Sequence, residues 1–491
     1  MRKMGFFGRE YELNLLENLK QKRIASLLVI RGRRRIGKSR LVDEFSKNAL
    51  KTDKLAYYKF AGLPPTAQTT AQSERDEFAR QLAKNFRTAL LKAEDWGDLF
   101  SFLARETKQG RVLILLDEIS WMGSKDPDFL GKLKNAWDME FKENAELILI
   151  LCGSVSAWIE DNILKNTGFV GRLSLALELK ELSLVECNQM LNAIGFRGNA
   201  YEKLKILSIT GGIPRYLEEI KKDRLADENI KDLCFTAEGI LFREFEEIFV
   251  DIFLKRAPIY KEIIESLLEG PQNFAEIVAK RGTHKNGHLS EYLKDLIRSG
   301  FVKKAATWDL RKGKPSSLIR YRLSDNYVRF YLKYIEKNRQ KIEDRHFNMM
   351  ALSNLPGFSS MMGLQFENLV LNNREFIWKK LHIFPENIVM DNPYFQRAQI
   401  RQAGCQIDYL IQMKTKVLYL CELKFSLEPL DQAVIQEVKE KMNRIVLPRG
   451  FSILPVLVHV NGVNERVKES EYFSHLIDFN ELLSAKPSRV R

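Results

Sequence analysis

The stretch that most limits the fold of this chain is Gly-Arg-Arg-Arg-Ile-Gly-Lys-Ser at residues 32–39. An apolar segment, SLLVIR, comes directly before it, and a segment with a helical pattern, SRLVDEFSKNAL, follows. Glycines at both ends of the loop let the backbone wrap around a phosphate, and the N–H groups that begin the next helix bind the anion. The pattern therefore predicts a phosphate-binding loop between a strand and a helix.

The side chains of this loop have separate expected roles. The ammonium of Lys38 reaches the terminal phosphates of a nucleotide, and the hydroxyl of Ser39 is placed to ligate magnesium. Side chains at the variable positions point away from a phosphate that the backbone holds, so Arg33, Arg34 and Arg35 are either a solvated rim or a contact with an acidic partner or nucleic acid. We expect nucleotide contacts at Gly32, Ile36, Gly37, Lys38, Ser39 and Arg40.

Five short apolar segments alternate with helical patterns before residue 180. They are SLLVIR, KLAYYKF, RVLILLDE, ELILILCGS and LSLALEL. Strands are nearly continuously apolar when crossover helices cover both faces of their sheet. The alternation therefore predicts a parallel α/β sheet of five strands.

The second half of a nucleotide site is expected where two of these strands end. RVLILLDE ends in Asp117, which would complete a magnesium site, and Glu118, which would polarise the attacking water. The alternative for Glu118 is a surface residue in the next turn. Ser154 follows the strand LILILC and offers a hydroxyl near the γ-phosphate, unless it only belongs to a strand-to-loop turn.

The size and charge of the chain limit its class further. A length of 491 residues exceeds what one hydrophobic core organises, and a net charge of +14 with a pI near 9.3 favours a polyanionic partner. The five cysteines form no C-x-x-C pair, which argues against a zinc ribbon or a disulfide framework. No apolar run approaches the roughly 20 residues of a membrane span. We therefore expect a cytoplasmic protein of several domains without a membrane partner.

The pattern changes twice after residue 180. Helical segments such as SLVECNQMLNAI come first and indicate a lid, and short helices followed by two strands, FVKKAAT and LIRYRLS, are the order of a winged helix-turn-helix. The predicted fold class is α/β. Its parts are a P-loop NTPase core with a parallel sheet at 1–180, a helical lid with connecting helices at 181–256, a winged helix-turn-helix at 257–335, a linker at 336–359 and a small α/β domain at 360–491.

Basic side chains are frequent in the predicted winged helix. Lysine and arginine neutralise DNA phosphates and release counterions, which supplies binding that does not depend on sequence. Duplex DNA is therefore the expected partner of this segment. The residues expected to contact its phosphates are Lys285, Lys294, Arg298, Lys303, Lys304, Arg311, Lys312 and Lys314.

A second group of chemically active residues lies in the last segment. Asp408 falls on one strand of a predicted hairpin, and Glu422 and Lys424 lie two apart on the next strand and so share a face. Glu367 lies on a preceding helix. Three carboxylates and a lysine can hold one or two divalent metal ions and activate water for attack on a phosphodiester. The alternative is an ordinary solvated strand or an inactive remnant.

Several motifs together resemble a known family. FFGREYELNLLENL, GRRRIGKS, LLDE, CGS, GR and TGGIPRYL occur in the order and spacing of the archaeal-type AAA+ ATPases, a branch allied to the STAND NTPases, and the resemblance covers roughly the first 330 residues. It implies that Phe7 to Glu10, with Phe7, Gly8 and Arg9 as nucleotide contacts, lie near the adenine and that the turn ending in Pro214 closes over the nucleotide. Arg172 matches an arginine finger, although a salt-bridged surface arginine remains the alternative.

The last segment resembles the PD-(D/E)XK nuclease superfamily over residues 360–491. The resemblance rests on an acidic residue on a first helix, an aspartate, a strand and Glu-x-Lys, although isoleucine stands where the motif has its proline. It implies that Asp408 and Glu422, completed by Glu367, ligate magnesium or manganese. Lys424 would act on the attacking water or on the charge that develops during cleavage.

These observations lead to two interpretations of function. The first is a switch that binds and hydrolyses ATP with magnesium and couples it to DNA binding and to metal-dependent cleavage of nucleic acid. The second is an ATP-regulated signalling scaffold or transcription regulator whose nuclease-like domain is inactive. A protein partner and a homo-oligomer are compatible with both interpretations.

Overall fold

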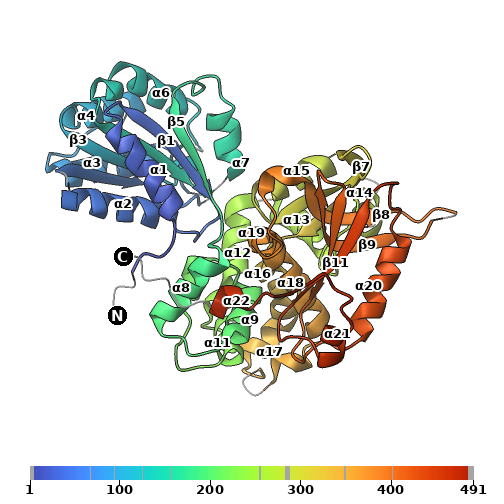
Figure 1. Ribbon diagram of the computed structural model, residues 1–491. Helices are drawn as coiled ribbons and strands as arrows, with labels where there is room; N and C mark the ends of the chain where they lie inside the picture. The colour runs from blue at the N-terminus through green and yellow to red at the C-terminus, as the bar shows by residue number, and fades with distance from the viewer. Residues whose placement is uncertain are drawn as a thin grey trace. The chain divides into compact units, whose positions relative to one another are not determined.

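The chain folds into two compact units, residues Met1–Glu181 and Leu182–Arg491 (Figure 1). The computed structural model describes residues 5–52, 54–66, 68–92, 94–123, 125–154, 156–253, 256–281, 288–347, 350–400 and 402–484. Among the helices of these ranges, none combines the length and the apolar character that a bilayer crossing requires.

The first unit is built on a five-stranded parallel sheet with the strand order β2-β3-β4-β1-β5. Each strand coincides with one of the five apolar segments, so the predicted parallel α/β sheet is confirmed. The strands are β1 (Ser26–Gly32), β2 (Leu55–Ala61), β3 (Arg111–Asp117), β4 (Leu147–Gly153) and β5 (Leu173–Leu179).

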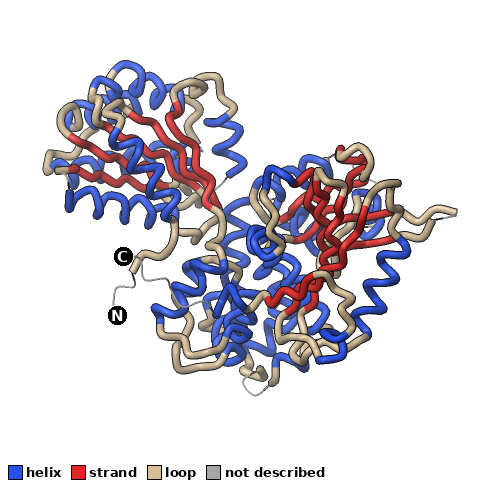
Figure 2. The backbone as a smooth tube through the Cα atoms, viewed as in Figure 1, coloured by secondary structure: helices blue, strands red, loops and turns tan. Residues whose placement is uncertain are grey.

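Helices cover the sheet of this unit (Figure 2). On one face, alternate residues of β3 and β4, among them Ile114 and Leu149, pack against Phe78, Phe100 and Phe129 of three different helices. The neighbouring residues of both strands are also buried, which explains their unbroken apolar sequence. The helices are α1 (Glu10–Gln21), α2 (Lys38–Thr52), α3 (Ala71–Phe86), α4 (Trp96–Glu106), α5 (Ile119–Gly123), α6 (Phe129–Met139) and α7 (Ser156–Ile159).

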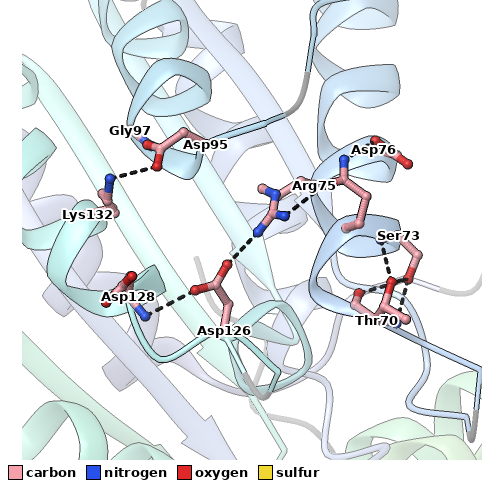
Figure 3. A network of polar contacts seen from close by, with 10 residues as sticks. Thr70, Ser73, Arg75, Asp76, Asp95, Gly97, Asp126, Asp128 and Lys132 are labelled. Carbon is pink, nitrogen blue, oxygen red and sulfur yellow. Dashed lines mark hydrogen bonds and ion pairs between the residues drawn. The ribbon is translucent and has the colours of Figure 1, made fainter.

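Polar contacts fasten the ends of these helices (Figure 3). Asp95 caps α4 by accepting from the Gly97 N–H and also binds Lys132 of α6 at 2.7 Å. Arg75 of α3 donates to Asp126 at 2.6 Å, which ties the loop after α5 to α3. The network therefore ties α4 to α6 and α3 to the loop before α6.

Glu74 supplies a prediction about stability. Its side chain is 2% exposed and accepts from the Leu63 N–H at 3.0 Å, and burial raises the pKa of its carboxyl above the ordinary 4.5. The folded state therefore binds the proton more tightly than the unfolded chain, and ionisation costs stability at higher pH. We expect Glu74→Gln, which keeps an acceptor for Leu63, to melt at a higher temperature than the wild type at pH 8. Thermal melts should show this advantage shrinking as the pH falls to 4.5, and an advantage independent of pH would contradict the prediction.

The second unit begins with the predicted lid helices and continues through the predicted winged helix. Three helices and a two-stranded antiparallel hairpin follow the helices predicted as a lid, and the assignment of these elements to a winged helix stays a prediction. Lys285 lies outside the described residues. The elements are α8 (Leu184–Ile194), α9 (Ala200–Thr210), α10 (Pro214–Leu217), α11 (Ala226–Cys234), α12 (Ile240–Phe253), α13 (Ala257–Glu265), α14 (Phe274–Arg281), α15 (Leu289–Arg298), β6 (Val302–Asp309) and β7 (Lys314–Leu323).

The hairpin packs against the C-terminal sheet of the same unit. Trp308 of β6 is buried, and its indole N–H donates to the side chain of Gln412 at 2.6 Å. The amide of Gln412 donates in turn to the Leu310 carbonyl at 3.0 Å. Trp308 and Leu310 belong to one apolar core with Ile407 and Leu410. The hairpin and the C-terminal sheet therefore share a core.

The segment 336–359, expected as a linker, contains short helices. They include α17 (Arg339–Glu343) and a 3₁₀ turn at Leu352–Asn354. Among the described residues of this segment, the buried apolar side chains include Ile342, Phe347, Leu352 and Leu355. Apolar burial thus ties the segment into the second unit.

The C-terminal part contains the expected small sheet, of five strands in the order β12-β11-β10-β9-β8. β8, β9 and β10 pair antiparallel, and β10, β11 and β12 pair parallel. The elements are α18 (Phe358–Asn372), α19 (Arg374–Lys380), β8 (Ile388–Gln396), β9 (Cys405–Met413), β10 (Val417–Lys424), α20 (Ala433–Arg444), β11 (Ser452–His459), α21 (Glu465–Glu469), β12 (His475–Asp478) and α22 (Glu481–Ser484).

Candidate functional site

The loop between β1 and α2 has a backbone that needs its two glycines. Gly32 has φ +149°, and a Cβ added there would lie 2.5 Å from the carbonyl oxygen of Leu179. Gly37 has φ +93°, in the region that side chains rarely adopt. α2 begins at Lys38, so the N–H groups of its first turn face the loop. These features fit the phosphates of a nucleotide.

Lys38 is 5% exposed and bends back over the loop. Its Nζ donates to the carbonyl oxygens of Gly32 and Arg33, each at 3.0 Å. Arg33, the first of the three loop arginines, forms an ion pair with Glu181 of the same unit at 3.2 Å. The buried cation of the loop is thus the one that the sequence assigned to the phosphates.

Ser39 and Asp117 come together from the start of α2 and the end of β3. The hydroxyl of Ser39 donates to Oδ2 of Asp117 at 2.6 Å. A hydroxyl and a carboxylate oxygen are the hard donors that magnesium prefers, and their meeting at the mouth of the loop fits a magnesium ion. These two residues would hold the ion, which would offset the charge of the phosphates.

Glu118 follows Asp117 with φ +52°, and Ser154, the residue directly after β4, holds its side chain. Its Oε2 accepts from the Ser154 N–H at 3.1 Å and from the Ser154 hydroxyl at 2.9 Å. Burial raises the pKa of the Glu118 carboxyl, against the opposing effects of the Lys38 charge and these two bonds. The two predicted catalytic residues are therefore in contact, and Ser154 orients Glu118.

The N-terminal segment lies against the phosphate loop through two arginines. Arg9, which follows Phe7 and Gly8, donates to the Ile36 carbonyl at 3.3 Å and to the Lys180 carbonyl at 2.5 Å. Arg40 of α2 donates to the Gly5 carbonyl at 2.9 Å. These contacts bring the residues expected near the adenine to the loop.

Two other candidates of the ATPase site stand apart. Arg172 forms a two-pronged ion pair with Asp138, with both bonds at 2.8 Å, and holds the pKa of that carboxyl well below its usual range. An arginine finger would require this pair to open, so that role stays a prediction. Pro214 begins α10 in the second unit, and its contact with nucleotide also stays a prediction.

The C-terminal candidates meet on the β9–β10 hairpin. The pairing of Cys421 with Tyr409 places Asp408 beside β10, where its Oδ2 accepts from the Leu423 N–H at 3.1 Å. Burial, with the nearby charge of Glu367, raises the pKa of Asp408 to about 6.

A lysine that the sequence reasoning missed joins this cluster. Lys441 of α20 places its Nζ 2.6 Å from Glu422 Oε2 and 3.7 Å from Asp408 Oδ1. Lys424 lies 3.3 Å from the other oxygen of Glu422 and also binds Glu437 of α20. The available signal was the helical pattern directly after Glu-x-Lys, in which Glu437 and Lys441 share a face.

Glu367 on α18 faces basic residues. Burial raises the pKa of its carboxyl, and the charges of Arg329, Arg322 and Lys441 act in the opposite direction. Both arginines are buried, and Arg329 donates to the side chain of Gln365 at 2.9 Å while Arg322 binds the side chain of Asn368. Glu367 is thus a counter-charge for two buried arginines as well as a neighbour of the Asp408 cluster.

The cluster offers oxygen donors for a metal but already contains a cation. Asp408 and Glu422 are suitable ligands for magnesium or manganese, and Lys441 lies between them. In the described part of the chain, no three His, Cys, Asp or Glu side chains are grouped closely enough to hold a metal ion. A metal site here would require Lys441 to withdraw.

One protein family and one known protein match this chain. Residues 6–220 match a family described as an ATPase domain predominantly from Archaea. The chain is 27% identical over 380 residues to MJECL04, an uncharacterized protein of Methanocaldococcus jannaschii, with 76% of this chain and 77% of that protein covered.

Two solved structures are similar to the chain. The Walker-type ATPase PABY2304 of Pyrococcus abyssi has 18% identity and a TM-score of 0.50, with 67% of this chain and 97% of that one covered. The ORC2 protein of Aeropyrum pernix, in ADPNP–ADP complexes, has 15% identity and a TM-score of 0.46, with 70% and 95% covered. The first of these likenesses shows a shared fold.

The fold and the phosphate loop define a P-loop ATPase. Within that class, the N-terminal part of this chain is similar to the archaeal ATPase domain family that it matches. The predicted enzyme class, an ATPase, is confirmed.

Proposed function

We propose that this ATPase uses ATP binding and hydrolysis as a switch for binding duplex DNA and for metal-dependent cleavage of nucleic acid. The observation that carries the cleavage part is the meeting of Asp408, Glu422, Lys424 and Lys441 on one hairpin and the helix after it. Carboxylates beside lysines can bind a metal and stabilise the charge of a phosphodiester under attack. A bound metal would supply activation of water.

The DNA-binding part rests on exposed positive charge around the hairpin. The net charge of +14 supports the same interpretation. One face of the hairpin packs on the C-terminal sheet, which leaves its basic tip and outer face for phosphates. The exposed basic residues are Lys294 of α15, Lys303 and Lys304 of β6, Arg311 and Lys312 of the turn, and Lys314 of β7.

A second candidate function is an ATP-regulated scaffold or transcription regulator with an inactive nuclease-like domain. The observation that favours it is Lys441, because an ammonium between Asp408 and Glu422 satisfies both carboxylates without a metal. The shared core of hairpin and sheet also suits a rigid platform for a protein partner.

Duplex binding by the intact protein, measured with and without ATP at increasing salt, tests the DNA-binding part of the proposal. We expect affinity to fall steeply with salt, because each neutralised phosphate releases counterions. Lys312→Glu with Lys314→Glu should make the negative slope of log affinity against log salt shallower by about two. The control reverses two exposed lysines elsewhere, Lys92→Glu with Lys222→Glu, and should change the slope less.

The same measurement separates the two candidate functions. A shallow slope in the wild type, or equal effects of the two double variants, would contradict DNA binding by the hairpin and favour the scaffold. An affinity for duplex DNA that changes when ATP is added would support the switch. An affinity that is the same with and without ATP would contradict a coupling between ATP and DNA binding.

A further inference from the structure

A group of polar side chains lies beside the Ser39–Asp117 pair and has no role in the ATPase chemistry described so far. Asp43 is four residues after Ser39 on α2, so both residues lie on one side of the helix. Tyr57 and Lys59 are two apart on β2 and share a face of that strand. β2 pairs with β3, which ends at Asp117. α2, β2 and β3 therefore meet beside the carboxylate of Asp117, which was assigned to magnesium.

The distances define the arrangement. Lys59 Nζ lies 3.5 Å from Asp117 Oδ2 and 3.8 Å from Asp43 Oδ2. The hydroxyl of Tyr57 donates to Asp43 Oδ1 at 2.7 Å, and burial raises the pKa of Tyr57, so this phenol stays a donor. Lys59 therefore lies between two carboxylates, and one of its partner oxygens is the atom that accepts from Ser39.

We propose that Lys59 is an exchangeable counter-ion of the magnesium site and that Asp43 is its second partner. The inference rests on the magnesium assignment of Ser39 and Asp117. A divalent ion at those oxygens would lie close to the Lys59 ammonium, and two cations a few ångströms apart repel. The Lys59 side chain is 38% exposed and has a flexible stem, so it can turn from Asp117 towards Asp43.

The hydrogen bond from Tyr57 fixes the orientation of Asp43, so that Asp43 can accept the Lys59 ammonium. The Tyr57 bond holds one oxygen of Asp43 and leaves the other towards Lys59. Lys59 then competes with the metal for Asp117 and raises the concentration of metal at which the site fills. It acts as a positioning residue, because it sets the charge at Asp117 and contacts no reacting atom.

The test measures metal binding directly. Manganese is titrated in the presence of a non-hydrolysable ATP analogue, and free manganese is read from its electron paramagnetic resonance signal. Lys59→Met keeps most of the stem and removes the charge, and it should tighten manganese binding about fivefold, the range expected for one partly exposed ion pair. The analogue's affinity in EDTA, measured by calorimetry, should stay within about twofold of the wild type, because the phosphate loop is untouched.

Asp43→Asn should have the opposite effect. Without its second partner Lys59 stays on Asp117, so manganese binding should weaken, and most of that loss should disappear in the Lys59→Met background. Tyr57→Phe should act like a mild Asp43→Asn. The matched control is Lys47→Met, which removes an exposed lysine of the same helix that pairs with Glu44, and it should leave manganese binding unchanged.

The outcomes are distinguishable. Weaker manganese or analogue binding in Lys59→Met would show that Lys59 contacts phosphate and would overturn the proposal, and unchanged manganese binding would overturn it as well. Loss of manganese binding in Ser39→Ala, with the Lys59 effect absent, is expected if the site is correct. Manganese binding that survives Ser39→Ala would instead refute the magnesium assignment itself.

Discussion

We expect Lys38→Ala to abolish ATP turnover and to weaken ATP binding strongly, whereas Glu118→Gln should keep binding and trap ATP. Lys38 is the buried cation of the loop, held over it by the carbonyls of Gly32 and Arg33. Its loss removes the positive charge at the β- and γ-phosphates. Glutamine at 118 can still accept from Ser154 but cannot take up a proton from water, so turnover should fall about a hundredfold or more.

The measurements are calorimetry for binding and phosphate release for turnover. Arg34→Ala is the control, since it removes a cation from the same loop at a variable position, and its ATP affinity should fall far less. Wild-type affinity and turnover in Lys38→Ala would refute the assignment of the phosphate loop. Rapid ATP turnover in Glu118→Gln would refute the catalytic role of Glu118 and leave it only a structural role beside Ser154.

Asp408→Asn should abolish any metal-dependent cleavage of DNA by the intact protein. It should also abolish the rise in melting temperature that manganese gives the wild type, because a metal bound only to the folded state stabilises it. Without metal the variant should be at least as stable as the wild type at pH 8. The pKa of Asp408 is about 6, so ionising this buried carboxyl costs the folded state stability above that pH.

Variants of neighbouring residues sharpen this test. Lys441→Met should strengthen the manganese effect on melting if Lys441 competes for Asp408 and Glu422. Glu367→Gln should not lower the melting temperature at pH 8 without metal, because burial raises the pKa of this carboxyl and its ionisation costs the folded state stability, as at Asp408. Glu440→Gln on the exposed side of α20 is the control.

One result would remove the nuclease proposal. Wild-type protein that shows neither a manganese-dependent melting shift nor cleavage, with ATP present or absent, has an inactive cluster in which Lys441 replaces the metal. The ATPase would then remain as a switch that binds nucleic acid or protein.

Local patterns were sufficient to predict the core of the first unit. The unbroken apolar runs predicted the strands, because a strand covered on both faces leaves no polar position. The glycine spacing predicted the loop, because Gly32 and Gly37 have backbone angles that other residues rarely adopt. The two-residue period likewise placed Glu422 and Lys424 on one face of β10, where both contact the same cluster.

Contacts between distant segments were decided only by the tertiary structure. The local sequence pattern does not show whether Arg172 binds Asp138 or serves as an arginine finger. It also does not show whether Lys441 lies between two carboxylates or is a solvated lysine of α20. The same holds for Lys59 beside Asp117 and for Trp308 bound to Gln412.

The physical reason is the range of the interactions. Periodicity and backbone angles are properties of a few neighbouring residues, so the sequence alone determined the strands, the phosphate loop and the faces of the hairpin. Ion pairs and buried hydrogen bonds depend on which elements pack together, and packing is settled by the whole chain. The tertiary structure therefore decided which charge each candidate residue meets, and with it what Glu367, Arg172 and Lys59 can do.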